Sequence, residues 1–221
     1  MKKALVTGGS RGIGKAVCAE FLRHGFEVDA PARAELDLFS AASIEAFLES
    51  RRGVAYDAIV NNAGINDVHP IEEITDAEIE RMLAVDLVAP IRLLRGLVPA
   101  MKQNGGGRVV NVGSIWAVVS KPGRTVYSAA KNGVHGLTNT LAVELAPYGI
   151  LVNTLCPGFT LTELTAQNNT PAQIAEISRS IPLQRMAEPD EIARAIYFLC
   201  SPENTYLTGQ KITVDGGFTA Q

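Results

Sequence analysis

Short apolar runs alternate with longer amphipathic stretches along the whole chain, and this alternation limits the possible folds more than any other feature. The apolar runs have the length of strands, and the amphipathic stretches have the length of helices. Strands are expected at 3–7, 27–30, 34–38, 58–61, 108–112, 151–155 and 211–214, and helices at 12–24, 40–52, 76–103, 126–147 and 189–200. Repeated alternation with buried strands predicts a parallel sheet with helices on both faces. Because crossovers are right-handed, we expect a single doubly wound α/β domain of the Rossmann type over residues 1–221.

The composition excludes several classes of protein. Apolar residues make up 47% of the chain and charged residues 19%, which is enough to bury a substantial core. A net charge of −3 lacks the basic surplus of a protein that tracks nucleic-acid phosphates. Three isolated cysteines and three histidines have no metal-binding spacing, and no apolar run is long enough to span a membrane. These features predict a reduced, cytoplasmic protein without a metal, a nucleic-acid partner or a membrane contact.

A glycine-rich turn follows the first expected strand and opens the first expected helix. It reads Thr-Gly-Gly-Ser-Arg-Gly-Ile-Gly from position 7. Glycines at such a place let backbone N–H groups and the helix N-terminus face a pyrophosphate without obstruction by Cβ atoms. The turn therefore predicts a dinucleotide site formed by Gly8, Ser10, Arg11, Gly12, Ile13 and Gly14.

The spacing of this turn resembles the short-chain dehydrogenase/reductase family, and further motifs follow in that family's order. They are Asn61-Asn62-Ala63-Gly64 after the fourth expected strand, Ser114 after the fifth, Tyr127 and Lys131 in Tyr-x-x-x-Lys spacing, and Pro157-Gly158 before Thr160 and Thr162. The resemblance covers essentially the whole chain. Within the family, the chain looks most like 3-oxoacyl-carrier-protein reductases.

The resemblance implies an oxidoreductase that moves a hydride between NAD(P) and a ketone or secondary alcohol. It implies that Asn62, Ala63 and Gly64 lie beside the adenosine ribose and that Lys131 also holds the nicotinamide ribose. It further implies that the nicotinamide amide is bound by Pro157, Gly158, Thr160 and Thr162. The polar, weakly patterned segment at about 160–180 is expected to form a substrate lid.

Tyr127 and Lys131 carry the expected proton chemistry. Because they are four residues apart on an expected helix, both side chains project from one face. The neighbouring ammonium favours the tyrosinate form, so Tyr127 could exchange a proton with a substrate oxygen near neutral pH. Ser114 supplies a hydroxyl that can bond the same oxygen. The alternative is a non-catalytic dinucleotide-binding or sensing protein on the same fold, which the loss of Tyr127 or Lys131 would have favoured.

The residues after the second strand bear on the choice between NAD and NADP. A carboxylate there binds the adenosine ribose and selects NAD, whereas an arginine accepts the 2′-phosphate of NADP. The position that resembles the family's acidic selector is Ala32, and Arg33 follows it. Arg11 offers a second cation for the phosphate. These residues predict NADP(H) in preference to NAD(H).

Two features of the same region compete with that prediction. Glu35 and Asp37 are rival carboxylates, because the acidic selector often lies about 20 residues past the glycines. Against this, the segment from position 36 to Leu38 resembles the family's adenine-contacting segment and makes Asp37 and Leu38 adenine contacts. The family's helix between its second and third strands is almost entirely absent here, which would open the adenine pocket.

Asp86 stands where the family usually has an asparagine whose backbone carbonyl holds a relay water. One interpretation is that Asp86 is an inert isostere. The other depends on Pro90, which has no N–H to donate to the carbonyl of residue 86 in a regular helix. That carbonyl would then be free to bind a water leading toward Lys131.

The substrate and the assembly follow less directly from the sequence. An acyl thioester, a small polar ketone and a sugar all remain possible small-molecule substrates. A carrier-protein partner would need basic residues at the pocket mouth, and the candidates are Lys102, Arg108, Lys121 and Arg124.

The expected helix 76–103 is apolar on almost every side, so we expect a homotetramer formed through it and the Tyr127 helix.

Overall fold

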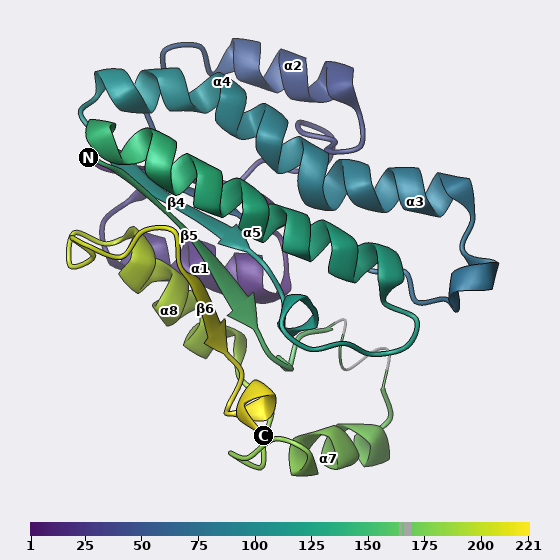
Figure 1. The fold of residues 1–221 in the computed structure, drawn as a ribbon. Coiled ribbons are helices and arrows are strands. Elements are labelled where there is room, and N and C mark those ends of the chain that lie inside the picture. Colours follow the sequence, from purple (N-terminus) through teal and green to yellow (C-terminus); the bar gives the residue numbers. More distant parts are fainter. Residues whose placement is uncertain (164, 166–168) are drawn as a thin grey trace.

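The computed structural model describes residues 1–163, 165 and 169–221, which form an α/β fold (Figure 1). Its strands are β1 (Lys3–Val6), β2 (Glu27–Asp29), β3 (Ala58–Asn61), β4 (Gly107–Val112), β5 (Ile150–Pro157) and β6 (Lys211–Val214). Its α-helices are α1 (Gly12–Arg23), α2 (Ala41–Ser50), α3 (Asp76–Leu83), α4 (Ala89–Gln103), α5 (Thr125–Leu145), α7 (Pro171–Arg179) and α8 (Pro189–Cys200). The shorter elements used below are η2 (Ala84–Val88), a π-helix, and η3 (Ile115–Ala117), a 3-10 helix.

The strands form one parallel sheet in the order β2-β1-β3-β4-β5-β6. The chain moves outward from β1 to β2 and then returns to the other side of β1 to place β3. The strand order therefore reverses between β1 and β3, and ligands of such sheets bind outside the carboxyl ends at this reversal. The expected doubly wound fold is confirmed.

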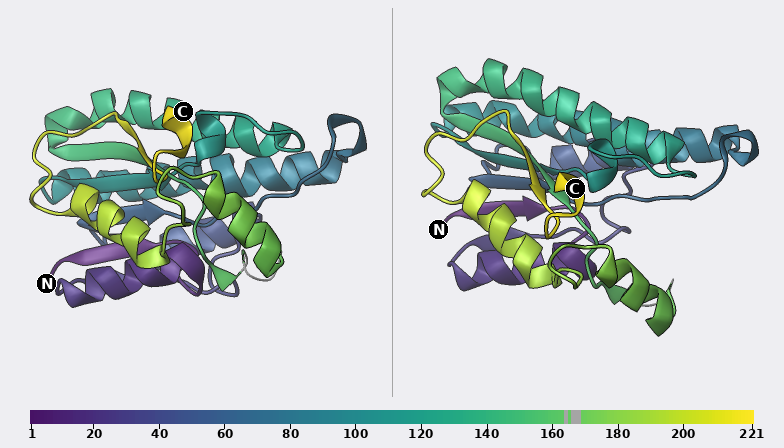
Figure 2. Two further views of the ribbon diagram at one scale, coloured as in Figure 1. Left: turned by 90° about the horizontal axis from the view of Figure 1, so that it is seen from below. Right: turned by 60° about the horizontal axis from the view of Figure 1, so that its bottom comes forward.

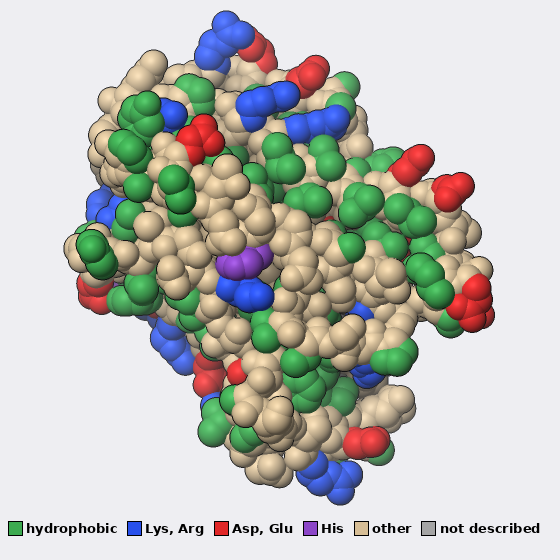
Figure 3. All heavy atoms as spheres, viewed as in Figure 1, with side chains coloured by type: hydrophobic (Ala, Val, Ile, Leu, Met, Phe, Trp, Pro, Cys, Tyr) green, Lys and Arg blue, Asp and Glu red, His purple; other side chains and the backbone are tan. Residues whose placement is uncertain are grey.

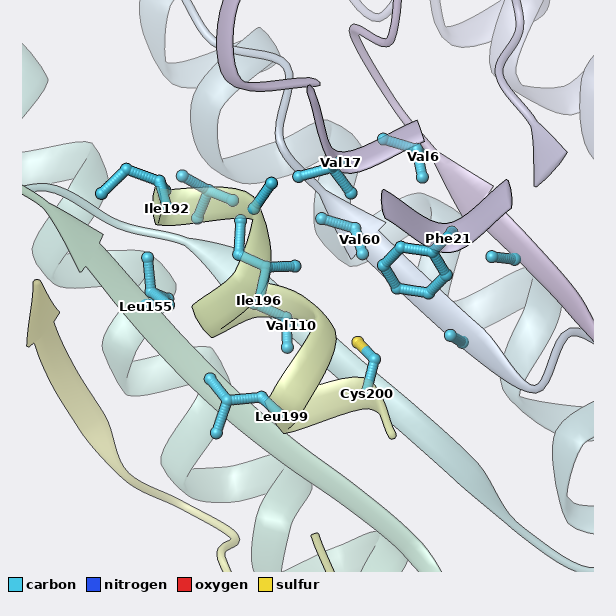
Figure 4. Close-up of a cluster of buried hydrophobic side chains, with 14 of the residues drawn as sticks. Val6, Val17, Phe21, Val60, Val110, Leu155, Ile192, Ile196, Leu199 and Cys200 are labelled. Atoms are coloured by element: carbon cyan, nitrogen blue, oxygen red, sulfur yellow. The ribbon is translucent and has the colours of Figure 1, made fainter. Parts of the chain in front are cut away.

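Helices cover both faces of the sheet (Figure 2). On one face α1 and α8 pack together, and Phe21 and Ile196 join the strand residues Val60 and Val110 in a buried cluster (Figure 4). On the other face α2, α4 and α5 supply a second buried cluster. No helix in the described ranges is long and apolar enough to cross a membrane.

The strand expected at 34–38 does not form, and that prediction was wrong. The segment is a turn in which Leu36 is buried in the cluster on the α2 face. The N–H of Asp37 donates to Ser43 Oγ at 2.9 Å, and Glu35 accepts from Arg51 at 2.8 Å. These contacts to α2 and its C-terminus hold the segment away from the sheet, so β2 is the edge strand.

The helix expected at 76–103 is present but is not regular throughout. Thr75 begins α3 with a capping box, and the π-helix η2 joins α3 to α4. A π-helix inserts a residue relative to α-helical pairing, and such bulges often occur at functional sites. Asp86 lies in this turn, and its side chain is buried.

Candidate active site

The glycine turn between β1 and α1 is shaped to receive an anion. Gly12 has φ +53°, and a Cβ at Gly14 would lie 2.1 Å from the carbonyl oxygen of Gly8. No side chain caps α1 from Arg11, so the first N–H groups of the helix are available. The N–H of Gly12 donates to the carboxylate of Glu163 at 3.1 Å. This carboxylate stands in for an anionic group, so the turn fits the pyrophosphate of a dinucleotide.

The Asn-Ala-Gly motif after β3 supports this turn through Thr7. Asn62 donates from Nδ2 to the carbonyl of Thr7 at 2.9 Å. The N–H groups of Asn62 and Ala63 donate to Thr7 Oγ1 at 3.0 and 3.1 Å. The motif thus fixes the end of β1 against the end of β3. Thr7 was not predicted, although its place directly before the first glycine was visible in the sequence.

The segment after β5 reaches back to the same turn. The β-bridge between Thr160 and Ala187 holds its beginning, and Thr160 is buried with its hydroxyl bonded to the carbonyl of Gly158. A Cβ placed on Gly12 would lie 3.3 Å from Thr162 Cγ2. Thr162 therefore lies next to the glycine turn, and Pro157, Gly158 and Thr160 belong to the segment that leads to it. Residues 164 and 166–168 of the expected lid lie outside the described residues.

Ser114, Tyr127 and Lys131 meet at the carboxyl end of β4. Ser114 is buried and caps η3, where its Oγ accepts from the N–H of Trp116 at 3.2 Å. The helix α5 packs against η3 and brings Lys131 to the end of β4, where its Nζ donates to the carbonyl of Val112 at 3.1 Å. The same Nζ lies 5.5 Å from the centre of the Tyr127 ring. The three predicted residues are therefore brought together.

A buried polar network that the sequence analysis missed ties α5 to the sheet below this site. Asn61 donates to Asn111 Oδ1 at 2.8 Å, and Asn111 donates to Thr138 Oγ1 at 2.9 Å. Thr154 Oγ1 donates to Thr138 Oγ1 at 2.7 Å. Polar residues within otherwise apolar strands were the available signal. Because buried polar groups need partners, the network fixes the position of α5 relative to β3, β4 and β5.

The side chain of Asp86 lies in the site, beside Lys131. Its Oδ1 accepts from the N–H of Ile65 at 2.8 Å, and its Oδ2 lies 4.0 Å from Lys131 Nζ. Oδ2 is buried without a hydrogen-bond partner among the described residues. Burial raises the pKa of Asp86 to about 6, although the Lys131 ammonium and the Ile65 N–H oppose the rise. Gly64 leaves room for this pair, because a Cβ there would lie 3.2 Å from both Asp86 and Lys131.

The residues expected to choose the cofactor lie together after β2. Arg33 is 85% exposed, and its guanidinium lies 3.7 Å from a carboxylate oxygen of Asp37. Leu38 is half-buried, and Arg11 is exposed at the start of α1. Asp29, at the end of β2, is another carboxylate of this region. It accepts hydrogen bonds from Arg51 Nε at 2.8 Å and from the Tyr56 hydroxyl.

Two of the four basic residues considered for the pocket mouth lie at the wrong end of the sheet. Lys102 lies over the Tyr148 ring near the end of α4. Arg108 lies near the start of β4 and donates to the carbonyl of Asn204 at 2.8 Å. Both precede β4 or lie near its beginning, whereas Ser114 follows its end. Lys121 and Arg124 lie in the loop between η3 and α5, which follows the carboxyl end of β4.

Comparison with known proteins places the chain in a family. Residues 27–219 match the family described as Enoyl-(Acyl carrier protein) reductase. The chain is 36% identical to the 3-oxoacyl-[acyl-carrier-protein] reductase FabG of Vibrio harveyi, with 98% of this chain and 96% of that protein covered. The chain belongs to the short-chain dehydrogenase/reductase family.

Other members of the short-chain dehydrogenase/reductase family match over the same length. The chain is 31% identical to the D-beta-hydroxybutyrate dehydrogenase of Rhizobium meliloti, covering 100% of this chain and 99% of that one. A 4-hydroxyisoleucine dehydrogenase complexed with NADH superposes with a TM-score of 0.94 at 27% identity, covering 100% of both chains. The chain also superposes on a protein of Beutenbergia cavernae, described as an NAD(P)-dependent gluconate 5-dehydrogenase and solved with NADP. The TM-score is 0.92 at 32% sequence identity, and the match covers 100% of this chain and 97% of that one.

Family membership settles the general class of reaction. The chain is an NAD(P)-dependent dehydrogenase/reductase that interconverts ketones and alcohols. The non-catalytic alternative is thereby set aside. The names of the relatives cover an acyl thioester, hydroxybutyrate, hydroxyisoleucine and gluconate, so they leave the substrate open.

Proposed function

We propose that this protein is an NADP(H)-preferring oxidoreductase in which Tyr127 exchanges the proton with the substrate oxygen. The observation that carries the proposal is the meeting of Ser114, Tyr127 and Lys131 at the carboxyl end of β4. When bound, the nicotinamide supplies or accepts the hydride. The substrate is a ketone or secondary alcohol, such as a 3-oxoacyl thioester, a polar small ketone or a sugar.

Each of the three side chains has a separate task. Ser114 donates a hydrogen bond to the substrate oxygen and stabilises the charge that develops there. Tyr127 gives a proton to that oxygen in reduction and takes it back in oxidation. Lys131 bonds the nicotinamide ribose. Asp86 and the relay water proposed at its backbone carbonyl connect Lys131 toward solvent.

The cofactor site is proposed to include Gly8, Ser10, Arg11, Gly12, Ile13, Gly14, Asn62, Ala63, Gly64, Pro157, Gly158, Thr160 and Thr162. The preference for NADP(H) rests on Arg33, with Asp37 and Leu38 beside it. Arg33 is exposed and free to turn toward a 2′-phosphate, and a guanidinium suits a phosphate through parallel hydrogen bonds. The contact with Asp37 is long and solvated, so it competes only weakly.

We also propose how the protein is organised around this site. The described parts of segment 160–180 act as a lid over the cofactor, because Glu163 and Thr162 already lie on the glycine turn. The working form is a homotetramer built through α3, α4 and α5. A cytoplasmic location agrees with the free thiols of Cys18, Cys156 and Cys200, since reducing compartments keep thiols unpaired.

The test of the proposed function is Tyr127→Phe, which removes only the phenolic oxygen. Turnover of a neutral ketone with NADPH, followed at the nicotinamide absorbance, should fall by about a hundredfold or more. Binding of NADPH should change little. The matched control is Tyr148→Phe, which alters an exposed tyrosine near the opposite end of α5 and should retain full turnover. Near-normal turnover of Tyr127→Phe would remove Tyr127 from the reaction.

A further inference from the structure

One cation near the site has no carboxylate partner among the described residues. Arg124 precedes α5 by one residue and is half-buried. No carboxylate of the described chain lies within 4.0 Å of its guanidinium. Its Nε is fully buried and has no hydrogen-bond partner among the described residues. None of the four residues outside the described part is acidic: they are Leu164, Ala166, Gln167 and Asn168.

An unpartnered, half-buried guanidinium calls for an explanation. Arginine keeps its charge in proteins, so burial cannot be relieved by loss of a proton. A buried charge is costly unless it is paired and hydrogen-bonded. Burial accordingly lowers the pKa of Arg124, and the main opposing influence is Tyr127. The structure thus holds a cation next to the proton-transfer tyrosine with part of its hydrogen-bonding capacity unused.

Arg124 lies beside a cluster of aromatic side chains. Its guanidinium carbon lies 5.7 Å from the centre of the Trp116 ring, two residues after Ser114. Trp116 makes edge contacts with Phe159 at 5.9 Å and with Phe218 at 6.4 Å. All three aromatic rings are partly exposed. These rings come from η3, from the segment after β5 and from the C-terminus, and they form an apolar cluster in which Trp116 lies next to the cation.

The spacing of Arg124 and Tyr127 limits the size of the ligand. Residues three apart at the start of a helix have Cβ atoms about 5–6 Å apart. A group bound by Arg124 and an oxygen bound by Tyr127 can therefore belong to the same small molecule. A guanidinium binds a carboxylate through two parallel hydrogen bonds, and Arg124 has no carboxylate partner among the described residues.

From this arrangement we infer that Arg124 binds the carboxylate of the substrate, which is a short hydroxy acid or the corresponding oxo acid. This inference rests on the proposed function and names the substrate class of the same site. The carboxylate pairs with Arg124, the carbon chain contacts Trp116, Phe159 and Phe218, and the reacting oxygen lies between Ser114 and Tyr127. A neutral 3-oxoacyl thioester lacks a group for Arg124.

The experiment compares oxo acids of four to six carbons with their methyl esters, each reduced with NADPH. In the parent protein, kcat/KM for an acid should exceed that for its ester by at least about tenfold. Arg124→Gln should abolish this preference, mainly by raising KM for the acid by about tenfold to a hundredfold. Ester turnover should stay unchanged. Arg124→Lys keeps the charge without the parallel bonds and should retain part of the preference, while Lys121→Gln, in the same loop, should retain all of it.

Three outcomes would overturn the inference. One is equal use of acid and ester by the parent protein. Another is an equal loss for acid and ester in Arg124→Gln, especially with a displaced pH profile, because Arg124 would then act through Tyr127. The third is a failure to bind, measured by calorimetry on Tyr127→Phe with NADP bound. This variant should bind the hydroxy acid, and adding Arg124→Gln to it should remove that binding. If that binding is absent, the subsite is wrong even where ester reduction shows the proposed function to be right.

Discussion

The Asp86 carboxylate and the Lys131 ammonium lie 4.0 Å apart in the interior, and both side chains are almost completely buried. The two residues are 45 positions apart, on the π-helix η2 and on α5. Besides Lys131, the charged and titratable groups near the carboxylate are Asp67 and, beyond the ammonium, Tyr127. An asparagine here would keep the acceptor for Ile65 but would bring no charge to Lys131.

The first prediction concerns the pH dependence of stability. Burial raises the pKa of Asp86 from 3.8 to about 6, so between these values the folded protein keeps a proton that the unfolded chain has released. Stability contributed by this group is therefore lost as the pH rises through that window. Asp86→Asn has no such group, so its unfolding free energy should not fall in this way. Relative to the parent, the unfolding free energy of Asp86→Asn should therefore rise by on the order of 2 kcal/mol from pH 4 to pH 7. Urea unfolding of both proteins at both pH values measures this change. The same difference in unfolding free energy at pH 4 and at pH 7 would contradict the prediction.

Pro90→Ala tests the proposed relay water. Proline brings no N–H to the carbonyls one turn earlier, and alanine would supply one that competes with water for the Asp86 carbonyl. Turnover should fall by about tenfold where proton delivery limits the rate, while NADPH affinity stays the same. The matched control is Asp86→Asn, which leaves the carbonyl in place and should stay within a few-fold of the parent. The reverse order of effects would assign the role to the carboxylate.

Glu163→Gln tests the position of the cofactor pyrophosphate. The Glu163 carboxylate accepts from the N–H of Gly12, where we expect the anion of the cofactor to bind. Removing the charge weakens this competitor, so NADP should bind severalfold more tightly, and the gain should shrink as salt is added. Fluorescence titration of the cofactor measures the change. Glu176→Gln on α7 is the control, and identical affinities for the parent and both variants would refute the placement.

Arg33→Ala tests the choice of cofactor. An exposed guanidinium that pairs with the 2′-phosphate affects only NADPH, so KM for NADPH should rise by about tenfold or more while KM for NADH changes little. Arg52→Ala removes another exposed arginine, on the α2 side of the sheet, and serves as the control. Equal changes in KM for NADPH and NADH in Arg33→Ala would favour NAD as the cofactor, with Asp37 as the carboxylate that binds the adenosine ribose.

The last prediction concerns assembly. Part of the apolar surface of the 76–103 stretch is buried within the monomer, because α2 packs against α4, and α5 packs against α3 and η2. The buried apolar side chains include Met82, Ala89, Leu93, Leu94, Leu97 and Met101. Ile91 on α4 nevertheless stays 42% exposed and Val143 on α5 79% exposed. Hydrophobic side chains gather over α3, α4 and α5 on this face (Figure 3).

Ile91→Glu should therefore lower the mass measured by light scattering, since a charge would be buried in the interface. Leu22→Glu alters an exposed leucine of α1, on the opposite face, and should leave the mass unchanged. A monomeric parent protein at micromolar concentration would contradict the proposed tetramer.

Much of this protein follows from local sequence patterns. The alternation of apolar runs predicts the parallel sheet, and the Tyr-x-x-x-Lys spacing places Tyr127 and Lys131 on one helix face. The glycine turn predicts the anion site at the start of α1. Such features depend on residues a few positions apart, whose relative geometry is fixed by the helix or the turn itself.

Contacts between distant segments could not be predicted in this way. Only the folded chain brings Asp86 to Lys131, Glu163 to Gly12 and Arg124 to Trp116. Tertiary packing also overrode the expected strand at 34–38: Leu36 is buried in the cluster on the α2 face, and the segment bonds to Ser43 and Arg51. The sequence determines which groups are available and what each helix or strand presents. The tertiary structure decides which of these groups meet and which charges are buried, because both depend on the relative placement of segments far apart in the chain.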